Sequence, residues 1–122
     1  MTTALSRANF WVQLYGACAA PVFWLGQLML GYWLSAQACY GTDHPTVLAS
    51  AAPLRSALVG FDAVAILAAL SGLAASWLGW RATAPGERAR FMAIWGVMSS
   101  LWFLGAIIFS TIASVTVPLC AR

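Results

Sequence analysis

The sequence predicts an all-α membrane protein with three transmembrane helices, with a cytoplasmic N-terminus and an extracytoplasmic C-terminus. Of its 122 residues, 62% are hydrophobic and 7% are charged. A soluble domain has about 25% charged residues, so these charges are too few to coat a globule in water. The apolar residues form three runs, at 10–34, 54–80 and 91–117. At about 1.5 Å per residue, each run can cross a hydrocarbon core of about 30 Å. We expect one transmembrane domain over residues 1–122.

The first run, 10–34, is interpreted as an uncleaved helix. Arg7 and the A-x-A pattern of Ala36-Gln37-Ala38 would also suit a signal peptide, but the apolar part of a signal peptide has about 7–15 residues, and this run is far longer. Pro21 is expected to kink the helix and to leave backbone groups that a neighbouring helix must satisfy.

The residues between and after the apolar runs predict the loops and the end of the third helix. The loop 35–53 has no Lys or Arg, and the second loop, 81–90, has three Arg and a Pro85-Gly86 turn signal. The third run, 91–117, is followed by Pro118, which should end the helix.

The distribution of arginine predicts the orientation, because cytoplasmic loops are enriched in basic residues. With three spans, four of the six Arg lie on one side of the membrane: Arg7, Arg81, Arg88 and Arg90. The Arg-free loop 35–53 and Arg122 lie on the other side, with Arg55 near that surface. The N-terminus is therefore expected inside and the C-terminus outside.

Small residues recur every four positions and predict close helix contacts, which contribute more than apolar burial in lipid. These residues are Ala68, Gly72 and Ser76, then Ser71, Ala75 and Gly79, with Gly16, Ala20, Gly96 and Ser100 on the other helices. Packing within the chain and docking against a partner's helices both fit this pattern. The larger side chains of the third helix are expected to face lipid or a large partner: Trp102, Phe103, Ile107, Ile108 and Phe109.

Three polar residues lie inside the apolar runs: Arg55, Asp62 and Gln27. Arg55 and Asp62 are seven residues apart and share a helix face, with Cα atoms about 10 Å apart along the axis. Because helical side chains lean toward the N-terminus, Arg55 should lean outward, and Asp62 should bond a polar neighbour. A proton or ion relay is the functional alternative. Gln27 needs a hydrogen-bond partner, for which Asp62, a serine of the third helix and a partner subunit are the candidates.

The cysteines predict one disulfide. Cys39 and Cys120 lie just past the outer ends of their helices, in a compartment that is oxidising in bacteria, where thiols tend to pair. Cys18 lies inside the first helix and should stay reduced. The alternative is two unpaired thiols that face a partner or bind a metal.

The sequence offers little chemistry of its own. His44 is the one histidine, so bis-histidine haem ligation within the chain is impossible, and a single loop histidine is usually solvated. No zinc or iron–sulfur cysteine spacing, catalytic triad or phosphate-binding glycine loop is present. We therefore expect no catalytic residue, no metal site, no cofactor and no nucleic-acid partner.

One pattern of residues runs through the first and third helices and the ends that follow them: Pro21, Trp24, Gln27, Leu28, Tyr32, Leu34, Cys39, Arg90, Phe91, Ala93, Gly96, Ser100, Phe103, Ile107, Pro118 and Cys120. In this pattern the chain resembles a family of small bacterial membrane proteins associated with haem–copper (cytochrome c) oxidase subunits. The resemblance implies a non-catalytic accessory or assembly subunit of a respiratory oxidase in the bacterial inner membrane, bound to larger membrane subunits and to lipid. The alternative hypothesis is a small homo-oligomeric transporter or channel with Asp62 and Arg55 along its path.

Overall fold

The structure is a computed structural model that describes residues 2–40 and 51–117. These residues form three helices and no strand: α1 (Thr2–Tyr40), α2 (Ala51–Ala82) and α3 (Arg88–Thr116). Each helix holds a segment that is long and apolar enough to cross a membrane: Phe10–Gln37, Arg55–Ala82 and Arg88–Thr116. The predicted fold class, an all-α protein with three membrane-spanning helices, is confirmed.

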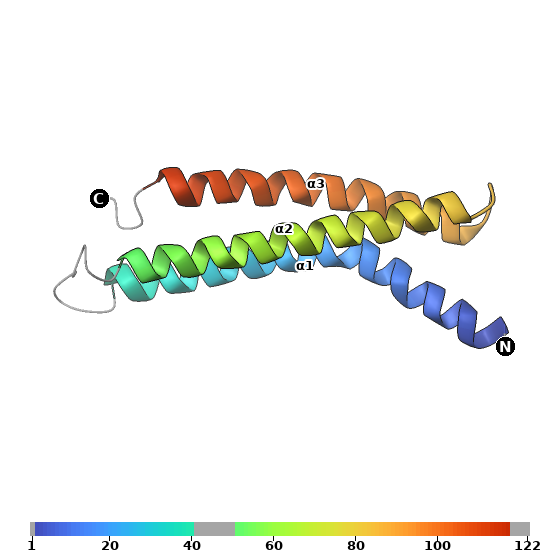
Figure 1. The fold of residues 1–122 in the computed structure, drawn as a ribbon, viewed down its shortest axis with the longest axis horizontal. Helices are drawn as coiled ribbons and strands as arrows, with labels where there is room; N and C mark the ends of the chain where they lie inside the picture. The colour runs from blue at the N-terminus through green and yellow to red at the C-terminus, as the bar shows by residue number, and fades with distance from the viewer. Residues whose placement is uncertain (1, 41–50, 118–122) are drawn as a thin grey trace.

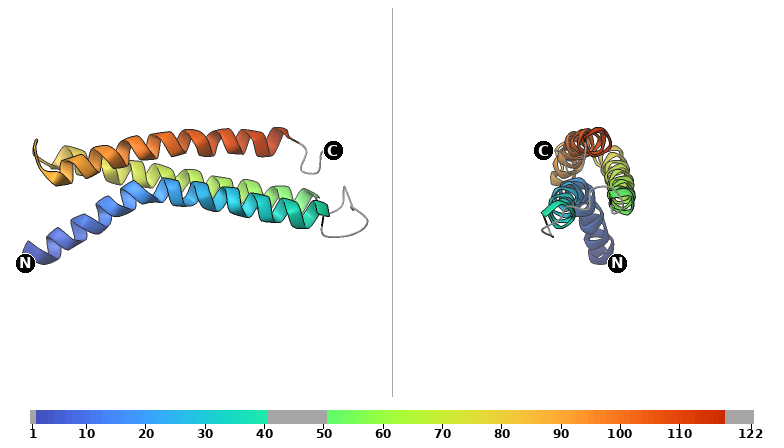
Figure 2. Two further views of the ribbon diagram at one scale, coloured as in Figure 1. Left: turned by 180° about the vertical axis from the view of Figure 1, so that it is seen from behind. Right: turned by 90° about the vertical axis from the view of Figure 1, so that its left-hand side faces the viewer.

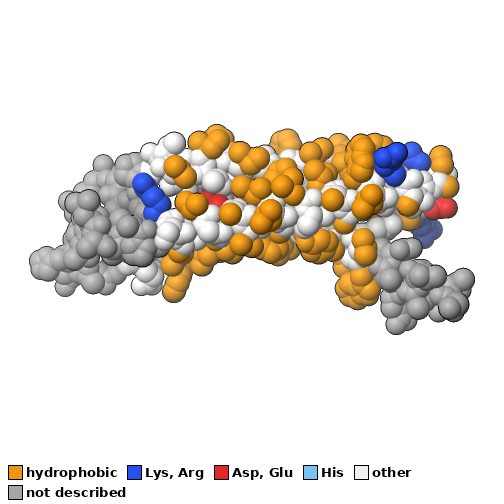
Figure 3. All heavy atoms as spheres, in the orientation of Figure 1, with side chains coloured by type: hydrophobic (Ala, Val, Ile, Leu, Met, Phe, Trp, Pro, Cys, Tyr) orange, Lys and Arg blue, Asp and Glu red, His pale blue; other side chains and the backbone are white. Residues whose placement is uncertain are grey.

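The helices run side by side as an elongated up-down-up bundle (Figure 1). The N-terminus and the α2–α3 turn lie at one end, called here the N-terminal end, while α3 finishes at the opposite, C-terminal end. Viewed along its length, the bundle places the helices at the corners of a triangle (Figure 2), and every pair of helices is in contact. Hydrophobic side chains cover the middle of the visible face, and basic side chains lie toward its two ends (Figure 3).

The helices differ in length from the predicted runs. Residues 35–40, 51–53, 81–82 and 88–90, expected to be loop, are helical. Hydropathy marks only the part of a helix that lies in hydrocarbon, and a helix can continue beyond it. Pro53 does not prevent this, since it lies in the first turn of α2, where its missing N–H has no helical partner. At the other boundary, Val117 is already extended, with φ −88° and ψ 135°, as expected for the residue before a proline.

The turn between α2 and α3 follows the predicted Pro-Gly signal. Glu87 donates its backbone N–H to the Ala84 carbonyl at 3.4 Å, and Gly86 between them has φ +91°. Proline at the second position and a positive-φ glycine at the third define a type II turn. Arg90 then donates to the Thr83 carbonyl at 3.2 Å. This bond satisfies one of the carbonyls left unpaired just beyond the end of α2.

Pro21 lies inside α1, and the part of α1 that precedes the middle of the bundle leans away from the other two helices (Figure 1). Because proline has no N–H, the Ala17 carbonyl, four residues earlier, loses its helical donor. Ser99 of α3 donates its hydroxyl to that carbonyl at 3.4 Å. Ser100 likewise donates to the Gly16 carbonyl at 3.1 Å. A neighbouring helix therefore satisfies the backbone at the proline, as predicted.

The apolar core at the middle of the bundle is built mainly from small residues. Ala20, Ala65, Ala69 and Ile107 are fully buried there. Trp24 and Phe103 pack against them, with ring centroids 5.3 Å apart. The expectation that Phe103 and Ile107 face outward is wrong, because both lie on the α3 face that also carries the buried Ser100. Trp102 and Phe109, 78% and 76% exposed, do point outward as expected.

Candidate functional site

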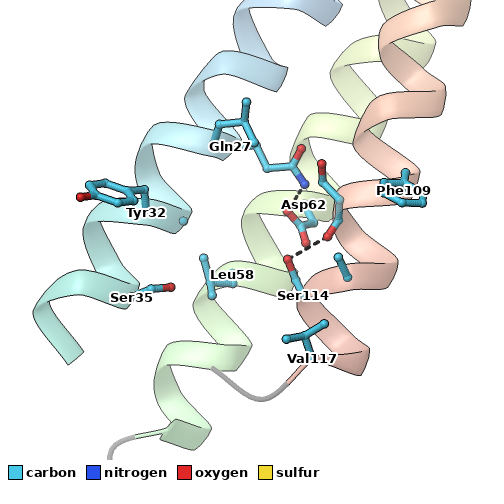
Figure 4. A pocket seen from close by; sticks show the side chains of 12 residues that line it. Gln27, Tyr32, Ser35, Leu58, Asp62, Phe109, Ser114 and Val117 are labelled. Carbon is cyan, nitrogen blue, oxygen red and sulfur yellow. Dashed lines mark hydrogen bonds between the residues drawn. The ribbon is translucent and has the colours of Figure 1, made fainter. Parts of the chain in front are cut away.

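The buried polar centre of the bundle is the pair formed by Gln27 of α1 and Asp62 of α2. Gln27 donates from Nε2 to Asp62 Oδ1 at 2.5 Å, and the two residues are 6% and 2% exposed. Figure 4 shows the two side chains meeting between the helices. Of the three partners that the sequence left open for Gln27, the structure selects Asp62. A hydrogen bond contributes about 0.5–1.5 kcal/mol between neutral groups and about 1.5–3 kcal/mol when one group is charged, so this contact helps to hold α1 against α2.

Each member of this pair also has an oxygen that is not hydrogen-bonded: the amide oxygen of Gln27 and the second carboxylate oxygen of Asp62. Gln27 Oε1 and Asp62 Oδ2 are buried, and neither has a partner among the described residues. Both atoms can only accept a hydrogen bond when the aspartate is ionised. Leaving a buried acceptor unpaired costs about 1–3 kcal/mol, and more for a charged group. The pair is thus a polar site that the described part of the chain does not complete.

A groove of about 430 Å³ runs from this pair to the C-terminal end of the bundle. Residues of all three helices line it: Gln27, Leu28, Gly31, Tyr32, Ser35, Leu58, Asp62, Phe109, Ser110, Ala113, Ser114 and Val117. Figure 4 shows its walls coming from α1 and α3, with the Asp62 and Leu58 side chains of α2 between them. This groove was not predicted, although the four-residue spacing of Gly31 with Ser35 and of Ser110 with Ser114 is visible in the sequence.

Arg55 does not take part in this site. It is exposed, and it is absent from the lining of the groove. As the outward lean of its side chain predicted, it forms no ion pair with Asp62, whose bonded partner within the described residues is Gln27. The three predicted intramembrane polar residues therefore separate into a buried pair and one exposed guanidinium.

The small residues meet in a second region, nearer the N-terminal end, which we call the small-residue junction: Gly16, Gly72, Ser76, Gly96 and Ser100. Gly72 and Ser100 are buried, and Ser76 is 1% exposed with its hydroxyl unpartnered among the described residues. A Cβ added at Gly16 or Gly96 would overlap with Ser76 Oγ, and one at Gly72 would lie 3.2 Å from Ala19 Cβ. Of the two interpretations of this stripe, packing within the chain is confirmed here.

The predicted disulfide and the histidine fall largely outside the part of the chain that the structure describes. Cys39 lies in the last turn of α1, whereas Cys120 and His44 lie outside residues 2–40 and 51–117. The Cys39–Cys120 bridge therefore stays a prediction. Cys18 is a free, exposed thiol, in agreement with the expectation that it stays reduced. Within the described residues, no group of three His, Cys, Asp or Glu side chains could hold a metal ion.

The chain matches no protein-family model, no curated protein and no solved structure.

Proposed function

We propose that the chain is a non-catalytic accessory or assembly subunit of a larger membrane complex. The incomplete polar site carries this proposal. Gln27 Oε1 and Asp62 Oδ2 are buried without partners in the described part of the chain, in a segment apolar enough to lie in the bilayer. Hydrocarbon offers no hydrogen bond, and each unsatisfied polar group there costs several kcal/mol. A protein partner that covers the groove would remove this cost.

The exposed surface of the bundle adds support. Trp102, Phe109 and Met29 are 78%, 76% and 70% exposed, while three of the four fully buried residues of the apolar core are alanine. Several of the large apolar side chains of the bundle are therefore available to lipid or to a partner. Bulky aromatic residues and methionine are also the side chains enriched in protein–protein interfaces.

The resemblance of the sequence to oxidase-associated proteins narrows the proposal to one complex. The partner is then a bacterial respiratory haem–copper (cytochrome c) oxidase of the electron-transport chain, and the chain is a multi-pass protein of the inner membrane. The N-terminus is cytoplasmic, since Arg81 and Arg88 lie at the end of the bundle that holds it. Cys39 and Cys120 would form their disulfide on the other, oxidising side.

The alternative, a small homo-oligomeric transporter or channel, has one observation in its favour, the groove that leads to Asp62. The path proposed for it also required Arg55, which does not line the groove. The geometry therefore favours the accessory subunit.

Purification from native membranes in a mild detergent tests the proposal. The tagged chain should bring with it a haem absorbance spectrum and the large oxidase subunits, and a tagged oxidase subunit should bring the chain. As a matched pair, Asp62→Leu should lower the amount of oxidase recovered, whereas Leu67→Ala at a 66% exposed site of α2 should not. A stable homo-oligomer without haem would overturn the proposal and support the transporter.

A further inference from the structure

We infer that the groove at Gln27 and Asp62 binds the guanidinium of an arginine that projects from a transmembrane helix of the partner. This inference rests on the proposed function, and it names the chemical group that completes the site.

The hydrogen-bonding groups in the groove favour a donor as the occupant. Among the described residues that line the groove, Gln27 Oε1 and Asp62 Oδ2 are the buried side-chain atoms without a partner, and both are oxygens. The Ser114 hydroxyl donates its proton to the Ser110 carbonyl at 2.9 Å, so its oxygen can only accept a further hydrogen bond. An apolar side chain or a lipid tail could not satisfy these acceptors.

Arginine is the side chain best suited to donate hydrogen bonds to these oxygens. It carries a positive charge opposite the one acid in the groove, and it has five N–H donors and no acceptor. Its planar fork can reach oxygens on two different side chains at once, and it binds carboxylates in charge-assisted hydrogen bonds. Guanidinium is also more weakly hydrated than ammonium, so moving it into a groove at membrane depth costs less.

The described residues of the chain do not supply this group. Arg55 is exposed and begins seven residues nearer the C-terminal end of the bundle, about 10 Å along α2, and its side chain leans further in that direction. Arg7, Arg81, Arg88 and Arg90 belong to helix segments at the opposite end. The donor must therefore come from outside this part of the molecule.

The walls of the groove allow a helix to approach. Gly31 and Ser35 on α1, and Ser110 and Ser114 on α3, are small residues spaced by four, the pattern that lets transmembrane helices come close. Asp62 lies seven residues inside the start of the α2 membrane segment at Arg55. The partner's arginine would thus lie about 10 Å inside the edge of the hydrocarbon.

Synthetic peptides in liposomes test the inference without any oxidase. The probe is a fluorescent Leu/Ala transmembrane peptide of about 24 residues with one Arg seven residues from its end; the control has the same composition with that Arg moved to the end itself. Energy transfer to labelled protein measures association. The wild-type protein and Leu67→Ala should bind the probe about tenfold or more tightly than the control, the ratio that one charge-assisted hydrogen bond gives.

Asp62→Asn keeps an oxygen for Gln27 but removes the charge, so this variant should lose most of the preference for the probe. Equal binding of both peptides to the wild-type protein would overturn the inference, as would a full preference that survives in Asp62→Asn. Neither result bears on oxidase co-purification, which tests the proposed function separately.

Discussion

The small-residue junction predicts opposite results for one substitution at two glycines of α3. Gly96 lies in the junction, whereas a Cβ added at Gly105 would meet nothing within 4 Å. Both positions are helical, so alanine brings the same gain in helix propensity, about 1 kcal/mol. In Gly96→Ala the new Cβ would overlap with Ser76 Oγ, lie 3.1 Å from Ser76 Cβ and lie 3.5 Å from the Ala17 nitrogen.

The magnitude follows from these contacts. Overpacking a tight interior costs about 1–3 kcal/mol. Since the helix-propensity gain cancels between the two variants, Gly96→Ala should be less stable than Gly105→Ala by about 1–3 kcal/mol. Ser76→Ala removes a buried hydroxyl that has no partner among the described residues, so it should cost little by itself. In that background Gly96→Ala should cost less, because the overlap with Oγ is gone and the contacts that remain, with the β-carbon of residue 76 and with the Ala17 nitrogen, are longer.

Reversible unfolding in mixed micelles of dodecyl maltoside and dodecyl sulfate, followed by near-ultraviolet circular dichroism, measures the free energy of unfolding of all four variants. The double variant closes the thermodynamic cycle. Our account of the junction would be refuted if Gly96→Ala were as stable as Gly105→Ala. It would also fail if the cost of Gly96→Ala were unchanged when Ser76 is alanine, since the overlap with Oγ would then play no part.

Three further predictions follow from the bundle. Asp62→Leu should lower the free energy of unfolding by about 1–3 kcal/mol, because Gln27 loses its acceptor, while Asp62→Asn should cost less; equal stability of the two variants in the same assay would show that the bond is dispensable. Topology reporters inserted in 41–50 and after the C-terminus should both report an extracytoplasmic position, and a cytoplasmic signal at the C-terminus would exclude three spans in this orientation. Alkylation without reductant, followed by mass spectrometry, should leave Cys39 and Cys120 unmodified in folded protein; alkylation of both would rule out the bridge.

The sequence by itself determined the fold class and the positions of the α2–α3 turn and of the end of α3. Chain length, the low charge and three apolar runs are sufficient for three membrane-spanning helices, because the thickness of the bilayer sets the length of each run. The turn at Pro85 and Gly86 and the end of α3 before Pro118 were also predictable, since proline and glycine restrict or free the backbone at their own positions whatever surrounds them. The need for a neighbour at Pro21 and for a polar partner at Gln27 follows from the same local chemistry.

Only the tertiary structure decided which face of each helix points inward. In a soluble helix an apolar stripe marks the buried face, but a membrane helix is apolar on all sides, so Phe103 and Ile107 could not be told apart from the exposed Trp102 and Phe109 by hydrophobicity. The choice of Asp62 as the partner of Gln27 and the exclusion of Arg55 from the groove depend on the same quantity, the rotation of each helix about its axis. That rotation is set by contacts such as those of Ser76 with two glycines of other helices, which lie far apart in sequence and meet only once the three helices pack.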